Sequence, residues 1–354
     1  MLLTNTNRHG GRGVSSYSAE TDARPRAVAY ELAGNTLQRT AFLQFSGAGS
    51  DSADWRALSV CLSASYACVC VDKPGYFGTS AVEAYSLDTI ARDAFAACSH
   101  LGVRRFVVIG HSLGLLAAIR FVRLYADRLP VAALVSLDGV TLNPAAVAIV
   151  EHMGRNAGLL ETLRRRLMRS GMLNLGPGEN DYPAPYVRLV GQSALRDTLA
   201  ERRQRAHQRA VAQELLAVPE VVSGFVLDEV GWLPPVHVIR AQQNAAGIEQ
   251  QPEALAFPEL AELMQRDTLE SEAWSRELAA RTGGTFEAVA SEHFVQWHRP
   301  AWLARRLRLL ADAVSARPLP GNTPSLGKSS ASKSSASESS PSERSVRARS
   351  AGAR

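Results

Sequence analysis

The chain has 354 residues, of which 46% are hydrophobic and 21% are charged, and its formal net charge is +5 at pH 7. This length fits one large domain or two small ones at about 100–200 residues per domain, with the composition of a packed globular protein. No run approaches the ~18 uninterrupted apolar residues of a transmembrane helix, so no membrane span is expected.

The positive charge is confined to the C-terminal tail. Residues 317–354 contain seven Lys or Arg and two acidic residues, which accounts for the whole excess, so residues 1–316 are formally neutral. The tail is rich in Ser and nearly free of large apolar residues, and it cannot bury enough surface to offset its ordering entropy. We therefore predict that it is disordered, with weak binding to acidic surfaces as the alternative. No nucleic-acid partner is expected.

The N-terminal sequence and the cysteine spacing indicate in which cellular compartment the protein is expected. Residues 1–25 lack the continuous apolar segment of a secretory signal and are predicted to be a flexible leader. The cysteines show no C-x2-C spacing of a zinc site, and four of them in a chain this long do not make a disulfide scaffold; they are Cys61, Cys68, Cys70 and Cys98. Reduced, buried thiols are the expectation, which favours a cytoplasmic location.

Strands and helices alternate along the first part of the chain. Apolar or aromatic runs predict strands at 27–34, 38–45, 67–72, 105–110 and 131–139. Helical spacing with start and stop signals predicts helices at 86–102 and 113–129. This alternation is typical of βαβ units, so we predict an α/β fold with a mostly parallel central sheet and helices on both faces.

The alternation then stops and later resumes. Residues 141–235 show only helical or loop signals. Strands are predicted again at 235–241 and 285–290, and helices at 270–283 and 300–314. We therefore expect a core formed by residues 26–140 and 236–316, with an inserted helical cap at 141–235.

A serine lies between two glycines where a predicted strand ends. Residues 110–114 read Gly-His-Ser-Leu-Gly, which fits G-x-S-x-G between a strand and a helix, the setting of a nucleophile elbow. The flanking glycines remove Cβ atoms that would clash in this turn. Ser112 would then lie at the carboxyl edge of the sheet, where the N-terminus of a helix offers free N–H groups. The alternative is a glycine-rich turn in which Ser112 is incidental.

In this context the sequence resembles the cap-bearing members of the α/β-hydrolase superfamily, over residues 26–316. Residues 42–55 (FLQFSGAGSDSADW) are similar to the strand, oxyanion loop and downstream Trp of that family. Residues 72–80 resemble its D-x-P-G-x-G-x-S segment, residues 110–114 its elbow, and residues 291–307 its closing His segment. The order of these matches makes the resemblance far more specific than any single motif.

The resemblance implies that His293 is the general base, because it follows the last predicted strand and respects the order serine, acid, histidine. A serine hydroxyl is a poor nucleophile until such a base takes its proton. His111 belongs to the elbow and is expected to serve in packing. His298, near the start of the last helix, is expected at the surface.

The acid of the triad has more than one candidate. Most of the family has an acid in a G-x-x-D segment after the strand that ends at 241, but residues 241–244 end in Asn244. An Asn can orient a histidine but cannot balance its charge. Asp138, at the end of the strand that follows the elbow, is the preferred acid, since some members place it there. Asp228 and Glu229 remain further alternatives.

The oxyanion hole should consist of backbone N–H groups. The resemblance implies that Leu113, directly after the elbow serine, and Ala48 supply them. Ser46 stands where the family usually has His, which would change the hydrogen bonds of that loop but leave the amides available.

A serine at the elbow implies acyl chemistry, because dehalogenases and epoxide hydrolases of this fold need an Asp there. We therefore expect a serine hydrolase of small carboxylic esters with Ser112 as nucleophile, His293 as base and Asp138 as acid. Hydrolysis of a thioester, amide or C–C bond is one alternative, and a catalytically degenerate protein that binds a small ligand is another. No cofactor and no metal are expected, and the oligomeric state is not predicted.

Overall fold

The computed structural model describes most of the chain, in these ranges: 11–17, 25–37, 40–99, 101–155, 179–225, 232–242 and 258–316. The tail predicted to be disordered, 317–354, lies outside the described residues. So do the alternative acids Asp228 and Glu229 and the alternative orienting amide Asn244.

The described residues form one sheet of eight strands in the order β1-β2-β4-β3-β5-β6-β7-β8. The strands are β1 (Gly11–Tyr17), β2 (Arg26–Ala33), β3 (Ala41–Phe45), β4 (Ala67–Val71), β5 (Phe106–His111), β6 (Val131–Leu137), β7 (Val236–Ala241) and β8 (Phe286–Val289). β2 pairs antiparallel with β1 and β4, and every other pairing is parallel. The sheet is therefore mostly parallel, as the sequence predicted.

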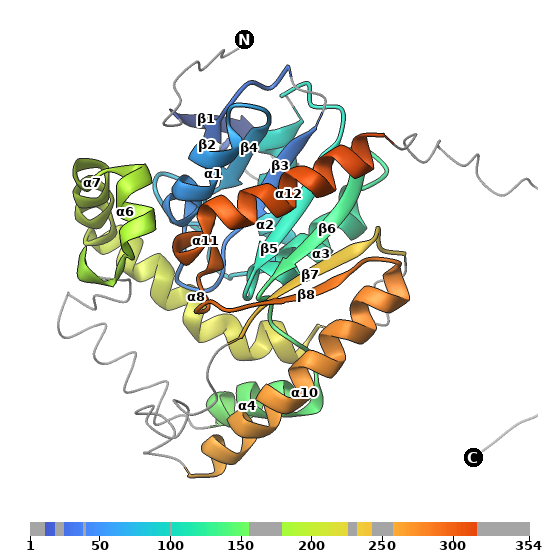
Figure 1. Cartoon of the computed structure of the whole chain (residues 1–354). Coiled ribbons are helices and arrows are strands. Elements are labelled where there is room, and N and C mark those ends of the chain that lie inside the picture. Colours follow the sequence, from blue (N-terminus) through green and yellow to red (C-terminus); the bar gives the residue numbers. More distant parts are fainter. Residues whose placement is uncertain are drawn as a thin grey trace, which may run out of the picture. The chain divides into compact units, whose positions relative to one another are not determined.

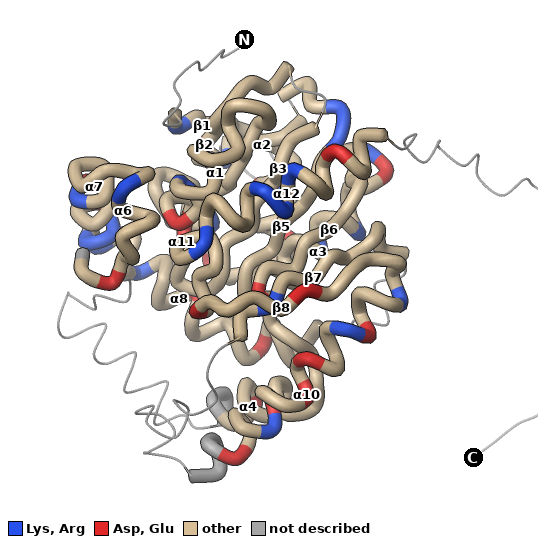
Figure 2. The backbone as a smooth tube through the Cα atoms, viewed as in Figure 1, with Lys and Arg blue, Asp and Glu red and all other residues tan. Residues whose placement is uncertain are grey.

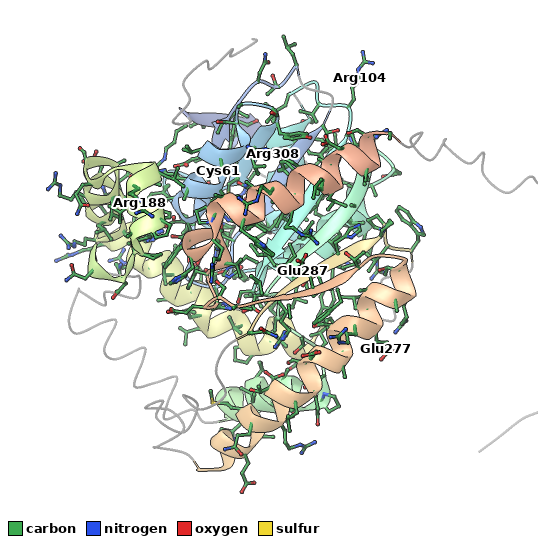
Figure 3. All side chains as sticks on the ribbon, in the orientation of Figure 1. Cys61, Arg104, Arg188, Glu277, Glu287 and Arg308 are labelled. Carbon is green, nitrogen blue, oxygen red and sulfur yellow. The ribbon has the colours of Figure 1, made fainter. Side chains whose placement is uncertain are left out.

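Helices cover both faces of the sheet (Figure 1). One face packs against α2 (Leu87–Cys98), α3 (Gly114–Tyr125) and α10 (Pro258–Thr282); the other packs against α1 (Arg56–Leu62), α11 (Val295–His298) and α12 (Pro300–Ser315). The strands β3, β4 and β5 are apolar along nearly their whole length because they are buried on both faces. Arg308 of α12 donates to the carbonyl oxygen of Cys61 in α1 and joins the two neighbouring helices (Figure 3).

The chain between β6 and β7 contributes helices and no strand among its described residues. They are α4 (Pro144–Arg155), a short 3-10 helix η2 (Glu179–Asp181), α6 (Ala184–Val190), α7 (Gln192–Arg202) and α8 (Arg205–Ser223). α4 contacts α8 and α10, while α6 contacts α1 and α11. We refer to residues 141–235 as the insertion.

The N-terminal segment differs from its prediction. Residues 1–25 were expected to be a flexible leader, but residues 11–17 form β1, which pairs with β2 along its full length. The sequence of β1, GRGVSSY, has no apolar alternation, so the strand depends on its partner rather than on its own propensity. β1 packs closely against β2 at Gly13, because a Cβ atom there would lie 2.4 Å from the ring of Tyr30.

Charges of both signs are interspersed over the described elements (Figure 2). On α10, Arg266 pairs with Glu270 and Arg276 pairs with Glu272 along the exposed side of the helix. Among the described helices, none has the length and apolar character needed to cross a membrane.

Candidate active site

The turn that carries Ser112 is tight and strained. β5 ends at His111 and α3 begins at Gly114, so Ser112 occupies the turn between them with φ 52°. A Cβ atom at Gly110 would lie 2.5 Å from the Cα of Leu115, and one at Gly114 would lie 2.3 Å from the carbonyl oxygen of Phe45. Both glycines are needed because backbone atoms occupy the space of a side chain.

The turn after β6 is bonded to the serine turn. β5 and β6 are parallel with His111 paired to Leu137, so Ser112 and Asp138 follow at the same level. The N–H of Ser112 donates to the carbonyl oxygen of Leu137 at 3.3 Å, and the N–H of Val140 donates to that of Ser112 at 3.1 Å. These bonds fix the two turns relative to each other.

Asp138 holds His293 through a short hydrogen bond. Its Oδ2 lies 2.6 Å from Nδ1 of His293, and its Oδ1 accepts from the N–H of Ala241 at 3.1 Å. The carboxylate is buried, while the side chain of His293 is 38% exposed. A carboxylate at Nδ1 keeps the proton on that nitrogen and leaves Nε2 free to accept one.

His293 lies in the loop between β8 and α11, against the elbow. Its carbonyl oxygen is 3.1 Å from Nε2 of His111, and the centroids of the two rings are 4.6 Å apart. His111 itself is buried, and burial together with the charge of His293 lowers its pKa well below the usual value. A neutral His111 with the proton on Nε2 donates to the His293 carbonyl oxygen and orients the loop. His298 is partly buried and lies 3.5 Å from a carboxylate oxygen of Glu292.

The loop after β3 approaches the serine closely. A Cβ atom at Gly47 would lie 2.8 Å from the Cβ of Ser112. Among the described residues, the backbone N–H groups of Ala48 and Leu113 donate no hydrogen bond. Ser46, at the position where a His was expected from the resemblance, accepts from the indole N–H of Trp55 at 2.9 Å and so anchors the start of this loop.

Two buried residues beside this loop were missed by the sequence analysis. Lys73, in the loop after β4, and Glu214, in α8, form a buried ion pair that also bonds the backbone of Gly47 and Gly49. The two charged residues are 141 positions apart, and no local pattern links them. The described residues contain no group of three or more His, Cys, Asp or Glu side chains that could hold a metal ion.

A sequence model described as the alpha/beta hydrolase family matches residues 45–307. The chain belongs to this family. Its fold, a mostly parallel sheet with helices on both faces, is therefore that of an alpha/beta hydrolase, as the resemblance implied. The matched range spans most of the chain, from the last residue of β3 into α12. No curated protein matches the sequence.

Solved structures of other alpha/beta hydrolases share the fold at low identity. A probable hydrolytic enzyme of Pseudomonas aeruginosa is 21% identical with a TM-score of 0.57, covering 84% of this chain and 93% of that one. A thermophilic esterase of Thermogutta terrifontis is 19% identical with a TM-score of 0.52, covering 86% and 99%. A putative epoxide hydrolase of P. aeruginosa is 19% identical with a TM-score of 0.53, covering 86% and 97%.

Proposed function

We propose that this alpha/beta hydrolase cleaves a small carboxylic ester through an acyl-enzyme. The observation that carries the proposal is the hydrogen bond of 2.6 Å between Asp138 and His293, beside a serine held at φ 52° on the elbow turn. A serine nucleophile needs a base that can accept its proton. The Asp138 carboxylate holds the proton of His293 on Nδ1, so that Nε2 can act as this base.

The reaction proceeds in two halves. His293 Nε2 takes the hydroxyl proton of Ser112 as Oγ attacks the ester carbonyl carbon, and the buried Asp138 stabilises the resulting imidazolium. The tetrahedral intermediate collapses, the alcohol leaves with the proton from His293, and the acyl group stays on Oγ. Water then attacks the acyl carbon with His293 again as base, which releases the acid and restores Ser112.

The negative charge of each tetrahedral intermediate forms on the former carbonyl oxygen. The N–H groups of Ala48 and Leu113, which donate no hydrogen bond to any described residue, are the donors that we assign to this oxygen. Removal of one such donor costs about 3–4 kcal/mol of transition-state stabilisation in a related chemistry.

Apolar side chains around these two donors support an uncharged acyl group. Leu113 and Leu116 pack with Val150 of α4 and Val222 of α8 in one buried cluster. The partly buried side chains packed against that cluster are Ala48, Leu87, Val140, Leu142, Val218, Val221 and Phe225. An acyl group bound beside this cluster would contact apolar side chains, which favours an apolar over a charged acyl group.

A fluorophosphonate probe tests the proposal, together with hydrolysis of p-nitrophenyl acetate. The wild-type protein should be labelled on one serine and should hydrolyse the ester, and Ser112→Ala should abolish both. Ser136→Ala, which removes a buried serine from β6, is the matched control and should keep the label. A folded wild-type protein that neither reacts nor hydrolyses would favour a ligand-binding role, and labelling with activity only on thioesters, amides or C–C bonds would reassign the substrate.

A further inference from the structure

The carboxylate of Glu214 is fully buried in α8 and accepts hydrogen bonds from four groups. Lys73 and Tyr76 donate to it at short range, Tyr85 donates at 2.8 Å, and the N–H of Gly49 donates at 3.1 Å. Burial and the charge of Glu214 raise the pKa of both tyrosines well above the usual value, so both keep their protons and act as donors. A carboxylate with this set of partners has a fixed position.

Lys73 connects this carboxylate to the oxyanion loop. Its ammonium group, only 4% exposed, donates to the carbonyl oxygen of Gly47 at 2.6 Å as well as to Glu214. The carbonyl of Gly47 and the N–H of Ala48 belong to one planar trans peptide group and point in opposite directions. Lys73 holds the Gly47 carbonyl oxygen toward its ammonium group, so the N–H of Ala48 points away from Lys73.

The loop is thus held on both sides of Ala48. Lys73 binds the carbonyl before it, and Glu214 binds the N–H of Gly49 after it. α8 lies close to both loops, since a Cβ atom at Gly75 would be 2.6 Å from the Cβ of Ala210 and one at Gly49 would be 4.0 Å from Val211. A hydrogen bond from an ammonium to the carbonyl also polarises the peptide group and strengthens its N–H as a donor.

We propose that Lys73 and Glu214 are positioning residues for the oxyanion hole. Through these two residues α8, a helix of the insertion, sets the orientation of the Ala48 N–H. This inference rests on the proposed esterase function. Stability alone does not account for this pair, because a protein in which neutral residues replace a buried ion pair is often as stable as the protein with the pair.

The double variant Lys73→Met/Glu214→Gln tests the inference. It leaves no buried charge and keeps an amide oxygen for the tyrosines, so the protein should fold. We expect kcat for p-nitrophenyl acetate to fall about 10- to 100-fold with KM changed less than about 3-fold, since a small displacement of a catalytic donor acts on the transition state. Hydrogen exchange of the Gly49 amide should accelerate at least about 10-fold as its acceptor weakens.

The matched control is Arg26→Met/Asp93→Asn, which neutralises another buried ion pair, between β2 and α2, in the same way. It should match the wild type in kcat and in the exchange of Gly49. If the Lys73/Glu214 double variant does not fold, Lys73→Gln/Glu214→Gln, which also leaves no buried charge, is compared in the same assays with Arg26→Gln/Asp93→Asn.

Unchanged kcat and unchanged exchange at Gly49 in the folded double variant would overturn the inference. So would an equal loss of kcat in the control, because the effect would then follow from loss of any buried pair. If the wild-type protein hydrolyses no ester, the proposed function fails separately, and the exchange of Gly49 alone decides whether the pair holds the loop.

Discussion

Ser112 and Asp138 occupy corresponding positions directly after the neighbouring parallel strands β5 and β6, and both adopt left-handed backbone conformations, with φ 52° and 42°. For residues other than glycine such conformations cost about 1–3 kcal/mol each and persist only where the surrounding structure imposes them. Here the backbone bonds from Ser112 to Leu137 and from Val140 to Ser112 impose them. Backbone strain occurs at both turns, and one turn carries a hydroxyl group and the other a carboxylate. This coincidence supports the proposed active site.

Replacement of Asp138 by Asn should lower kcat by roughly 10⁴-fold, the loss known for this change in a serine protease. The amide oxygen can still accept from Ala241, so the fold should be kept, but an Asn cannot balance the charge of protonated His293. Steady-state hydrolysis of p-nitrophenyl acetate measures the effect, with thermal unfolding as the control. Retained activity would move the acid to Asp228 or Glu229, or leave Asn244 to orient His293 as an amide.

Replacement of Gly47 by Ala should reduce kcat by about 10-fold or more, because a displacement near 1 Å at a reacting group can cost about 10²-fold. The added Cβ would lie 2.8 Å from the Cβ of Ser112 and 3.2 Å from Nδ1 of His111, so either the loop or the serine must shift. The rate of fluorophosphonate labelling should fall in parallel. A variant with normal labelling and normal kcat would show that the loop has room for a methyl group and would contradict this prediction.

Replacement of Arg202 by Met should destabilise the protein by about 3–5 kcal/mol, the cost of breaking a buried ion pair. Arg202 of α7 pairs with Asp51 at 2.6 Å and with Asp54 at 2.7 Å, and all three side chains are buried. Urea unfolding of Arg202→Met measures the loss. Arg276→Met is the control, since its exposed pair with Glu272 should contribute less than about 1 kcal/mol. Equal losses in both variants would contradict the role of burial.

Replacement of Asp72 by Asn should stabilise the protein increasingly as the pH rises. The carboxyl group is fully buried, and burial, followed by the charges of Asp51 and Glu31, raises its pKa to about 8. Between pH 4 and pH 8 the folded wild type therefore holds a proton that the unfolded chain has released, so its free energy of unfolding falls as the pH rises. Asn does not titrate, and one of the Asp72 oxygens has no hydrogen-bond partner among the described residues.

The difference in unfolding free energy between Asp72→Asn and wild type should grow by about 1.4 kcal/mol per pH unit in this window. Urea unfolding at several pH values between 5 and 8 measures it. A difference that stays constant across that range would show that Asp72 is ionised in the folded protein.

The fold class was predictable because its signals are local. Apolar strands, helix caps and the glycines around Ser112 each occupy a few consecutive residues, and the alternation of strands and helices then indicates a parallel sheet. The approach of Asp138 to His293 follows from their places after β6 and β8, because the carboxyl ends of parallel strands lie at one edge of the sheet. Their catalytic roles, and those of Ala48 and Leu113, stay predictions.

The features that escaped prediction depend on contacts between distant parts of the chain. β1 has no strand pattern of its own and forms because β2 offers an edge. Lys73 and Glu214 form their ion pair only when α8 packs against the loops after β3 and β4. A single sequence gives no periodicity or spacing from which such a pair could be inferred.

After a one-residue shift at the start of the two strands, Val107–His111 of β5 pair in register with Ala133–Leu137 of β6, and this pairing restricts changes in strand length more than changes in composition. Side chains alternate between the two faces of a strand with a period of two residues. An insertion or deletion of one residue between Ala133 and Leu137 would turn Asp138 to the opposite face and away from His293. We therefore infer that, in this part of the sheet, conservative apolar replacements are better tolerated than any alteration of the residue count.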